Sequence, residues 1–397
     1  MLVDSLGSGL FLPFSMIFFL RTTALTLPAI GAALSLAELI NMPGLLVYGQ
    51  LLDRMGPRAV VGIGNLVSAV GFVGFLAVHS APMLVLCATL VDCGSGLFWT
   101  ASPALINLAA DPGERSRWFG LSRVLRNAGV GVGALAAAAL VSATGDLGLR
   151  ILVVANSASF LGASALVGWW WRGPLSPPVP VLKRRPNPQK SGYLEVLRDR
   201  HFMRLMAANL VFVLCGDSLI LLLSVYVNRD LRSPLAIAGM LFTVNTALVV
   251  LLQTSLTRLA ERTAKPRVLR WSAALWGASF IVLGALAVVP KELIIPGLLV
   301  AITIFTGAEM LESPAMSDLV VTRAEGPALG RYLGVNQVSW AVAGAASPIL
   351  FTWLLNRGPM WPWLVLSGAC LGAILVLEAG GPDPGRLRRQ RTDEGAR

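Results

Sequence analysis

Carboxylic side chains stand inside long apolar stretches of this sequence, where ionisable residues are rare. In a membrane-buried helix such a group costs roughly a few kcal/mol unless it faces water or a partner, so it points to function. A carboxyl group in surroundings of low dielectric can exchange protons near physiological pH or bind a cation. The candidates for carrying protons or binding substrate are Asp92, Asp217, Glu309, Glu312 and Glu38.

Spacing places several of these carboxyls deep in the apolar layer. Asp92 lies ten residues after Pro82, so a rise of about 1.5 Å per residue sets it near mid-membrane. Asp217 reaches a similar depth. Asp4, by contrast, lies near the end of the first apolar stretch, so we expect it to be easily solvated and structural. Glu309 and Glu312 are three residues apart and share one helix face. For each carboxyl, a structural role as a buried group hydrogen-bonded to Ser, Asn or Trp remains an equal alternative.

Other polar and aromatic residues in the apolar stretches are candidates for a cavity wall: Trp99, Asn245, Asn336 and Gln337. Trp276 and Trp340 also lie mid-helix, where core packing is the commoner role. No Lys or Arg is expected at the depth of the carboxyls, and for Arg126 a loop-facing position is the simplest expectation. A negative cavity favours cations or protons over anions.

The elements that hold these residues are membrane-spanning helices. With 55% hydrophobic and 13% charged residues and a mean hydropathy of +0.71, the chain differs from soluble domains, in which about 25% of residues are charged. About 20 helical residues cross a bilayer. The sequence offers twelve stretches of that order: 2–20, 28–50, 59–79, 82–109, 118–143, 148–171, 202–227, 235–256, 268–289, 292–321, 329–356 and 360–379.

Charge is distributed unevenly between the loops on the two sides. Of the 32 Lys and Arg residues, six fall in the loops of one side: Arg21, Arg150, Arg229, Arg232, Lys291 and Arg357. Basic residues concentrate in cytoplasmic loops. We therefore expect an inner or plasma membrane protein with both termini cytoplasmic, and we attribute the net charge of +11 to topology and lipid contact rather than to nucleic acid.

The first stretch, 2–20, lacks a basic leading region and a cleavage site, so we expect a spanning helix rather than a signal peptide. It begins almost at Met1, which leaves open whether residues precede it. The four cysteines lie in apolar runs without metal-ligand spacing or an extracellular pair. No phosphate-binding Gly-x-x-x-x-Gly-Lys-Ser/Thr motif is present, so neither an ATP-driven pump nor an enzyme is supported.

A polar segment between two apolar runs carries the most specific pattern in the chain. Glycine permits a backbone bend there, and Pro57 suits the start of the next helix. The segment resembles the Gly-x-Leu-x-Asp-Arg-x-Gly-x-Arg/Lys loop of the major facilitator superfamily, and every fixed position is filled: Gly49, Leu51, Asp53, Arg54, Gly56 and Arg58. The resemblance implies a cytoplasmic conformational latch in which this loop pairs with Asp111.

Internal repetition agrees with that resemblance. Ser102-Pro103-Ala104 recurs as Ser313-Pro314-Ala315, which favours duplication of a six-helix unit. The expected fold class is an all-α membrane protein with twelve transmembrane helices in two pseudo-symmetric halves. The expected units are an N-terminal half (1–171), a basic Pro-rich cytoplasmic linker (172–200), a C-terminal half (201–380) and a disordered basic tail (381–397).

The resemblance implies a proton-coupled secondary transporter, most simply an exporter of small amphipathic or cationic molecules driven by the proton gradient. The sequence departs from the pattern of drug–proton antiporters in two places. The position of the arginine in helix 4 holds Leu90 or Asp92, and helix 5 has no Gly-Pro pair. An uptake carrier for a metabolite remains an alternative, as does a lipid flippase or transporter-like scaffold. Expected partners are a small-molecule substrate and membrane lipids, with a monomeric protein and no metal or other cofactor.

Overall fold

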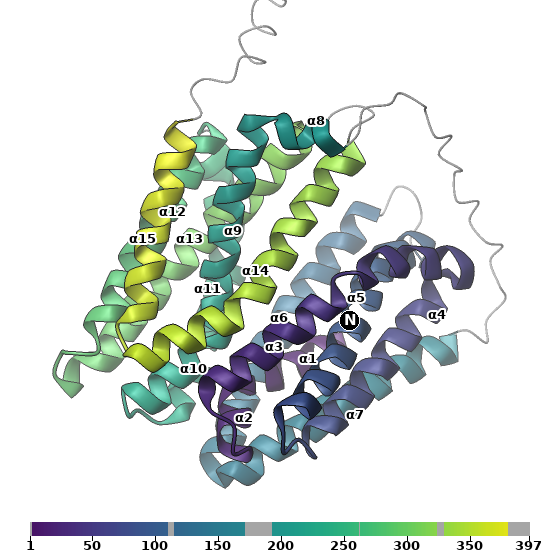
Figure 1. Ribbon diagram of the computed structural model, residues 1–397, viewed down its shortest axis with the longest axis horizontal. Coiled ribbons are helices and arrows are strands. Elements are labelled where there is room, and N and C mark those ends of the chain that lie inside the picture. Colours follow the sequence, from purple (N-terminus) through teal and green to yellow (C-terminus); the bar gives the residue numbers. More distant parts are fainter. Residues whose placement is uncertain (1, 110–114, 171–192, 262, 324–328, 380–397) are drawn as a thin grey trace, which may run out of the picture.

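The computed structural model describes residues 2–109, 115–170, 193–261, 263–323 and 329–379. These residues form helices joined by short connections, with no strand among them. The predicted linker, tail and Asp111 lie mostly or wholly outside this part of the chain, so those expectations stay predictions. Figure 1 shows the helices in two groups, one from the first part of the chain and one from the second.

The helices of the first group belong to the predicted N-terminal half, and its contacts run largely among its own members. Its elements are α1 (Leu2–Phe11), η1 (Leu12–Phe14), α2 (Ser15–Thr22), α3 (Leu27–Asn41), α4 (Gly44–Phe75), α5 (Ala81–Ala109), α6 (Arg115–Thr144) and α7 (Asp146–Trp170).

The second group repeats this arrangement with a short lead-in helix. Its elements are α8 (Tyr193–Arg198), α9 (Arg200–Leu221), α10 (Leu223–Val225), the π-helical turn η2 (Tyr226–Asp230), α11 (Leu235–Glu261), α12 (Lys265–Ala285), η3 (Lys291–Leu293), α13 (Ile294–Arg323), α14 (Leu329–Arg357) and α15 (Trp361–Glu378). We call the side of the molecule at which α7 ends and α8 begins the linker side.

Eleven spans in the described residues are long and apolar enough to cross a membrane. The remaining predicted span, 28–50, is divided: α3 ends at Asn41, and α4 begins at Gly44 after Pro43. The predicted turn between spans two and three lies inside α4, where Gly56 has a φ of +78°. Only glycine adopts that conformation readily, and Pro57 then begins the next helical segment.

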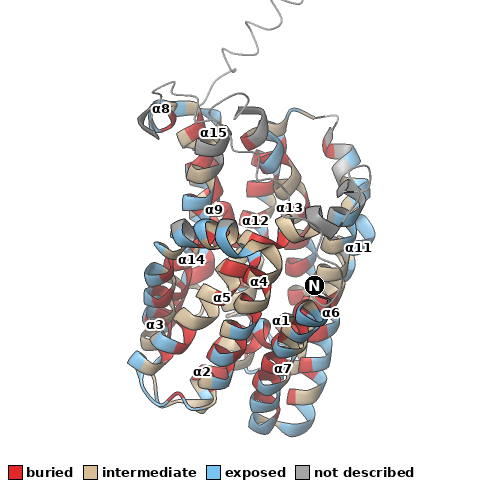
Figure 2. Ribbon diagram, turned by 90° about the vertical axis from the view of Figure 1, so that its right-hand side faces the viewer, coloured by how far each residue is buried: buried red, intermediate tan, exposed pale blue. Residues whose placement is uncertain are grey.

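Burial follows the seams between helices, while the outer surface is apolar. Figure 2 shows buried residues where helices face one another and exposed residues on the outside. Large apolar side chains on that surface include Leu251 and Val288, each 73% exposed. A soluble protein rarely exposes so much apolar surface in one belt, so this distribution is that of a multi-pass membrane protein whose outer face contacts lipid.

The two groups meet along α3 with α14 and along α6 with α11. These contacts lie toward the side opposite the linker side, because they involve the start of α3 and the end of α14. The Ile349 backbone N–H donates to Ser35 Oγ at 3.1 Å. A Cβ atom on Gly31 would collide with Thr352 Oγ1, so glycine is what allows this close approach.

Candidate functional site

A cavity of about 530 Å³ lies between the groups on the linker side of these contacts. Volumes of this size accommodate small organic molecules. Most of its wall comes from the C-terminal half, and α6 closes the other side. Residues lining it are Arg126, Asn127, Asn209, Phe212, Val213, Gly216, Asp217, Ile220, Val249, Gln253, Trp276, Glu309, Glu312, Ser313, Met316, Ser317, Val320, Asn336 and Trp340.

A second cavity of about 330 Å³ adjoins the first and shares Arg126, Asn127, Ile220, Val249 and Glu309 with it. Its wall is more evenly divided between the halves. It adds Asp4, Ser5, Ser8, Leu12, Ser95, Trp99, Val130, Leu219, Phe242, Asn245 and Thr246. Because five lining residues are common to both, we treat the two as compartments of one space between the halves.

Glu309 stands where the compartments join. Its Oε2 accepts a hydrogen bond from Asn245 Nδ2 at 3.0 Å, and the same amide group lies 2.9 Å from Thr306 Oγ1. Glu312, one turn further along α13, lines the larger compartment with Glu309. The i, i+3 spacing therefore does place both carboxyls on the cavity face of one helix, as predicted.

Asp217 faces the larger compartment from α9, and its Oδ2 accepts a hydrogen bond from Ser347 Oγ of α14 at 2.5 Å. That serine also bonds to the Ala343 backbone oxygen. Asp217 is therefore tethered to α14, the helix that meets the N-terminal half. A charge change at Asp217 acts directly on an element of the interface between halves.

Glu38 and Asp92 line neither compartment. Their carboxyl groups instead lie close to each other between α3 and α5. Glu38 also lies beside α14, since a Cβ atom on Gly344 would be 3.8 Å from Glu38 Oε1. The structure thus separates the five predicted carboxyls into three in the cavity and a pair near the interface.

Arg126 contradicts the expectation that no basic residue lies among the carboxyls. It lines both compartments rather than facing a loop. Its guanidinium carbon lies 5.0 Å from the centroid of the Trp99 ring, a distance at which a cation is attracted to an aromatic face. Its position in the sequence already hinted at depth, because it follows the start of α6 by about three helical turns.

Two further expectations need correction. Gln337 is exposed and lines neither compartment, because its neighbour Asn336 occupies the face of α14 that turns inward. Asp4, expected to be easily solvated, is 9% exposed and lines the smaller compartment. The sequence signal for Asp4 was its resemblance to Asp217, since each is followed by serine near the start of its half.

The remaining cavity predictions are located as follows. Trp99 and Asn245 line the smaller compartment, and Asn336, Trp276 and Trp340 line the larger one. Core packing was the commoner expectation for Trp276 and Trp340; Trp276 is indeed buried, yet it also forms part of the cavity wall.

The predicted latch can be located only in part. Gly49 and Gly56 both lie within α4, Arg54 is exposed and Arg58 is half-buried. The side chain of Asp53 and the whole of Asp111 fall outside what the structure describes. The pairing between this loop and Asp111 therefore stays a prediction.

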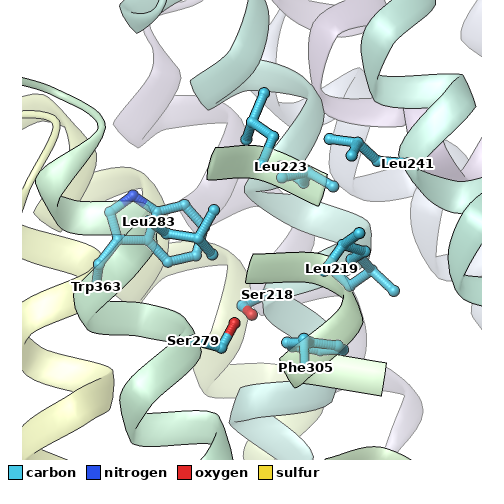
Figure 3. A pocket seen from close by; sticks show the side chains of 10 residues that line it. Ser218, Leu219, Leu223, Leu241, Ser279, Leu283, Phe305 and Trp363 are labelled. Atoms are coloured by element: carbon cyan, nitrogen blue, oxygen red, sulfur yellow. The ribbon is translucent and has the colours of Figure 1, made fainter. Parts of the chain in front are cut away.

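A third cavity of about 10 Å³ lies wholly within the C-terminal half and is shown in Figure 3. Apolar side chains such as Trp363 and Phe305 surround it. Its two serines are already satisfied, since Ser218 Oγ donates to the Cys215 oxygen and Ser279 Oγ to the Ala301 oxygen. Its volume suits at most about one water molecule, so it is a packing defect and not a substrate site.

Metal binding has no geometric support in the described part of the chain, where no group of three or more His, Cys, Asp and Glu side chains could hold an ion. The cavity instead combines carboxyls, amides, one guanidinium and aromatic rings between two helical groups. Such a space at the interface of two six-helix units is the usual substrate location of secondary transporters.

Comparison with known proteins decides the family. The profile described as the Major Facilitator Superfamily matches residues 1–234 and, in a second match, 205–395. The chain belongs to the Major Facilitator Superfamily. Members of this superfamily are transporters and not enzymes.

Individual relatives of this Major Facilitator Superfamily member agree. The multidrug resistance protein MdtH of Klebsiella pneumoniae (strain 342) is 25% identical over 354 residues, which cover 88% of this chain and 84% of the relative. Among solved structures, the nucleoside transporter NupG has a TM-score of 0.76 at 13% identity, covering 96% of this chain and 96% of that one. A bacterial homologue of the iron transporter ferroportin, in an inward-facing state, scores 0.77 at 16% identity, with 96% and 97% coverage.

Proposed function

We propose that this protein is a proton-coupled exporter of small amphipathic or cationic molecules. One observation carries the proposal: carboxyls of both halves, including Asp4 and Glu309, line one space together with aromatic side chains. Aromatic faces and carboxyls are the groups that attract organic cations. The name of the relative from Klebsiella pneumoniae, a multidrug resistance protein, supports export of such molecules.

We further propose that the linker side is cytoplasmic and that the membrane is the inner or plasma membrane. Support comes from the excess of Lys and Arg in the loops of that side. With that orientation, the halves touch toward the outside and the cavity lies toward the cytoplasm. The described conformation is then the one that loads a substrate from the cytoplasm or the inner leaflet.

The mechanism we propose is alternating access. The halves part at the α3–α14 and α6–α11 contacts and close on the linker side, which exposes the cavity to the outside. Proton binding by Asp217, Glu309 or Glu312 would remove the negative charge that holds a cationic substrate, so substrate leaves as a proton enters. The energy source is the proton gradient, without a cofactor; the protein acts as a monomer whose partners are its substrate and lipids.

The direct test is proton movement in proteoliposomes that contain an internal pH dye. Lipophilic cations and neutral drugs are added to the wild type and to Asp217→Asn and Glu309→Gln. Asp318→Asn is the matched control, because Asp318 is an exposed carboxylate of α13 that lines neither compartment. We expect at least one compound to drive proton flux that a cavity substitution abolishes and the control leaves intact.

Two other results would contradict the proposal. Flux of a metabolite or lipid that is insensitive to pH, with no proton movement from the drug panel, would replace export by an uptake carrier or flippase. If joint neutralisation of Asp92, Asp217 and Glu309 left the function of the cell's own protein unchanged, the carboxyls would be structural and a scaffold role would stand.

A further inference from the structure

One wall of the larger compartment carries buried polar atoms that no described residue satisfies. They are Asn209 Oδ1, Asn336 Oδ1 and Trp276 Nε1. Asn209 and Trp276 are each only 1% exposed. A buried polar atom without a hydrogen-bond partner is destabilising, so atoms of this kind are retained where a ligand or an ordered water completes them.

Asn209 is held in place by a hydrogen bond that leaves its side-chain oxygen without a partner among the described residues. Asn209 Nδ2 donates to Ser339 Oγ at 2.7 Å, and that hydroxyl donates to the backbone oxygen of Asn336 at 2.7 Å. Because its amide nitrogen is engaged, the group of Asn209 that still lacks a partner is its oxygen, an acceptor. The two bonds join the Asn209 side chain of α9 to Ser339 of α14 and so fix the position of the Asn209 amide.

Trp276 is fixed in a different way. Its ring packs against Phe212 with centroids 5.5 Å apart and against Phe305 with centroids 5.9 Å apart. The indole plane therefore has little freedom, and the orientation of its N–H group is set before any ligand binds. Groups arranged in advance lose little entropy on binding, which strengthens each hydrogen bond they make.

The groups of this wall named here offer more hydrogen-bond acceptors than donors. Asn209 and Asn336 offer acceptor oxygens, and the Asp217 and Glu312 carboxyls add further acceptors, whereas the Trp276 N–H can only donate. A quaternary onium ion has no N–H group and satisfies none of the acceptors. A protonated primary or secondary amine has two or three N–H donors as well as the positive charge.

Resting on the proposed export function, we infer that this wall discriminates among organic cations by hydrogen bonding. It selects protonated primary and secondary amines whose N–H groups donate to Asn209 and Asn336, with a ligand oxygen accepting from Trp276. We call it the amine wall. Of the residues common to both compartments, Glu309 already accepts from Asn245 and Arg126 lies over Trp99, so we assign the selection to the amine wall.

The test measures binding to the full-length protein in lipid nanodiscs by titration calorimetry. The probes are 4-phenylbutylamine, its N,N,N-trimethyl derivative and N-(3-aminopropyl)benzamide, whose carbonyl supplies an acceptor. In the wild type, we expect trimethylation to raise Kd by about tenfold or more, because hydrogen bonds to a charged group are lost. Asn336→Leu should bring the Kd values of the primary amine and its trimethyl derivative close together, because an acceptor is lost. Asn336→Asp keeps an acceptor and should preserve the ratio of the two Kd values.

Trp276→Phe tests the donor separately, because it keeps an aromatic ring and removes the N–H group. It should raise Kd for the benzamide about tenfold and leave Kd for 4-phenylbutylamine nearly unchanged. Trp271→Phe is the matched control, since Trp271 lies on the same helix, is 48% exposed and lines neither compartment. Thermal unfolding of each variant verifies that it is folded.

Two outcomes would overturn the inference. Equal affinity of the wild type for the primary amine and its trimethyl derivative, with proton flux from both, would contradict selection by the amine wall. It would not contradict the proposed export function. A ratio that survives both Asn336→Leu and Asn209→Leu would show that other groups discriminate. Absence of both binding and proton flux for all three probes would instead count against the proposed export function itself.

Discussion

A single guanidinium changes the electrostatic character of the cavity. Arg126 lies over Trp99 where the two compartments join, on the wall opposite Glu309 of α13. Among the described residues that line the space, the carboxyls are thus accompanied by one permanent positive charge. For the proposed function, we therefore expect affinity for a charged substrate group to depend on which part of the wall that group faces, rather than on the net charge of the whole cavity.

Asp230 offers a stability prediction outside the spans. It ends η2, and burial raises its pKa to about 6, against the opposing effect of Arg229, whose Nε lies 3.9 Å from Oδ1. Its Oδ2 is buried without a partner among the described residues. Since the folded pKa lies above the unfolded value, ionisation of Asp230 opposes folding, and the penalty grows from about pH 4 to pH 6 and then stays constant.

Asp230→Asn should therefore raise the free energy of unfolding by roughly 2 kcal/mol at pH 7.5 and by little at pH 4. The measurement is thermal unfolding of purified protein in detergent at both pH values. The nearby Tyr226 hydroxyl, which donates to the Leu283 oxygen at 2.6 Å, does not ionise in this range. Equal stabilisation at the two pH values would show that ionisation is not the cause.

At the scale of elements, close approach of α3 and α14 depends on the absence of a side chain. A Cβ atom on Gly31 would collide with the backbone oxygen of Pro348 as well as with Thr352 Oγ1. Backbone cannot move aside as a flexible side chain can. We therefore expect the linker-side cavity to depend on the contact between these two helices on the other side.

Gly31→Val should separate α3 from α14 and shift the population away from the described conformation. Labelling of a Ser317→Cys reporter in the larger compartment by a hydrophilic maleimide should then slow by about fivefold or more. Gly372→Val of α15 is the control, because nothing lies within 4 Å of the Cβ atom it would add. Unchanged labelling in Gly31→Val would mean that this contact does not hold the state.

At the scale of the whole molecule, Arg21 connects the two halves on the side opposite the linker. Its Nη1 donates to Asp146 Oδ1 of α7 at 3.1 Å, and its Nη2 donates to Asn228 Oδ1 of η2 at 2.7 Å. One residue at the end of α2 thereby links helices of the N-terminal half to a π-helical turn of the C-terminal half. Such bonds must break if the halves part on this side, as the proposed alternating access requires.

Arg21→Ala should favour the conformation that is open on that side by about two- to fivefold, since partly exposed ion pairs contribute roughly 0.2–1 kcal/mol. Double electron–electron resonance between spin labels at the exposed positions Leu147 and Leu293 would report a larger fraction of long distances. Arg150→Ala, a basic residue of α7 on the same side, serves as the control. An unchanged distance distribution would show that Arg21 does not restrain the opening.

Much of the architecture could be predicted from the amino-acid sequence. The last predicted span, 360–379, corresponds to α15 at Trp361–Glu378, because about 18 to 20 apolar residues are a length constraint set by the bilayer. Gly56 and Pro57 marked the bend inside α4 for local backbone reasons. The shared face of Glu309 and Glu312 followed from helical periodicity alone.

What faces the cavity was decided by tertiary structure. Asn336 lines the wall while the adjacent Gln337 is exposed, and Arg126 turns inward from a helix whose periodicity shows little preference for one face. A helix that is apolar on all sides carries little information about which face meets water, lipid or a neighbour. Likewise, the close approach of the Glu38 and Asp92 carboxyls depends on how α3 and α5 pack, and sequence spacing between separate helices does not encode that geometry.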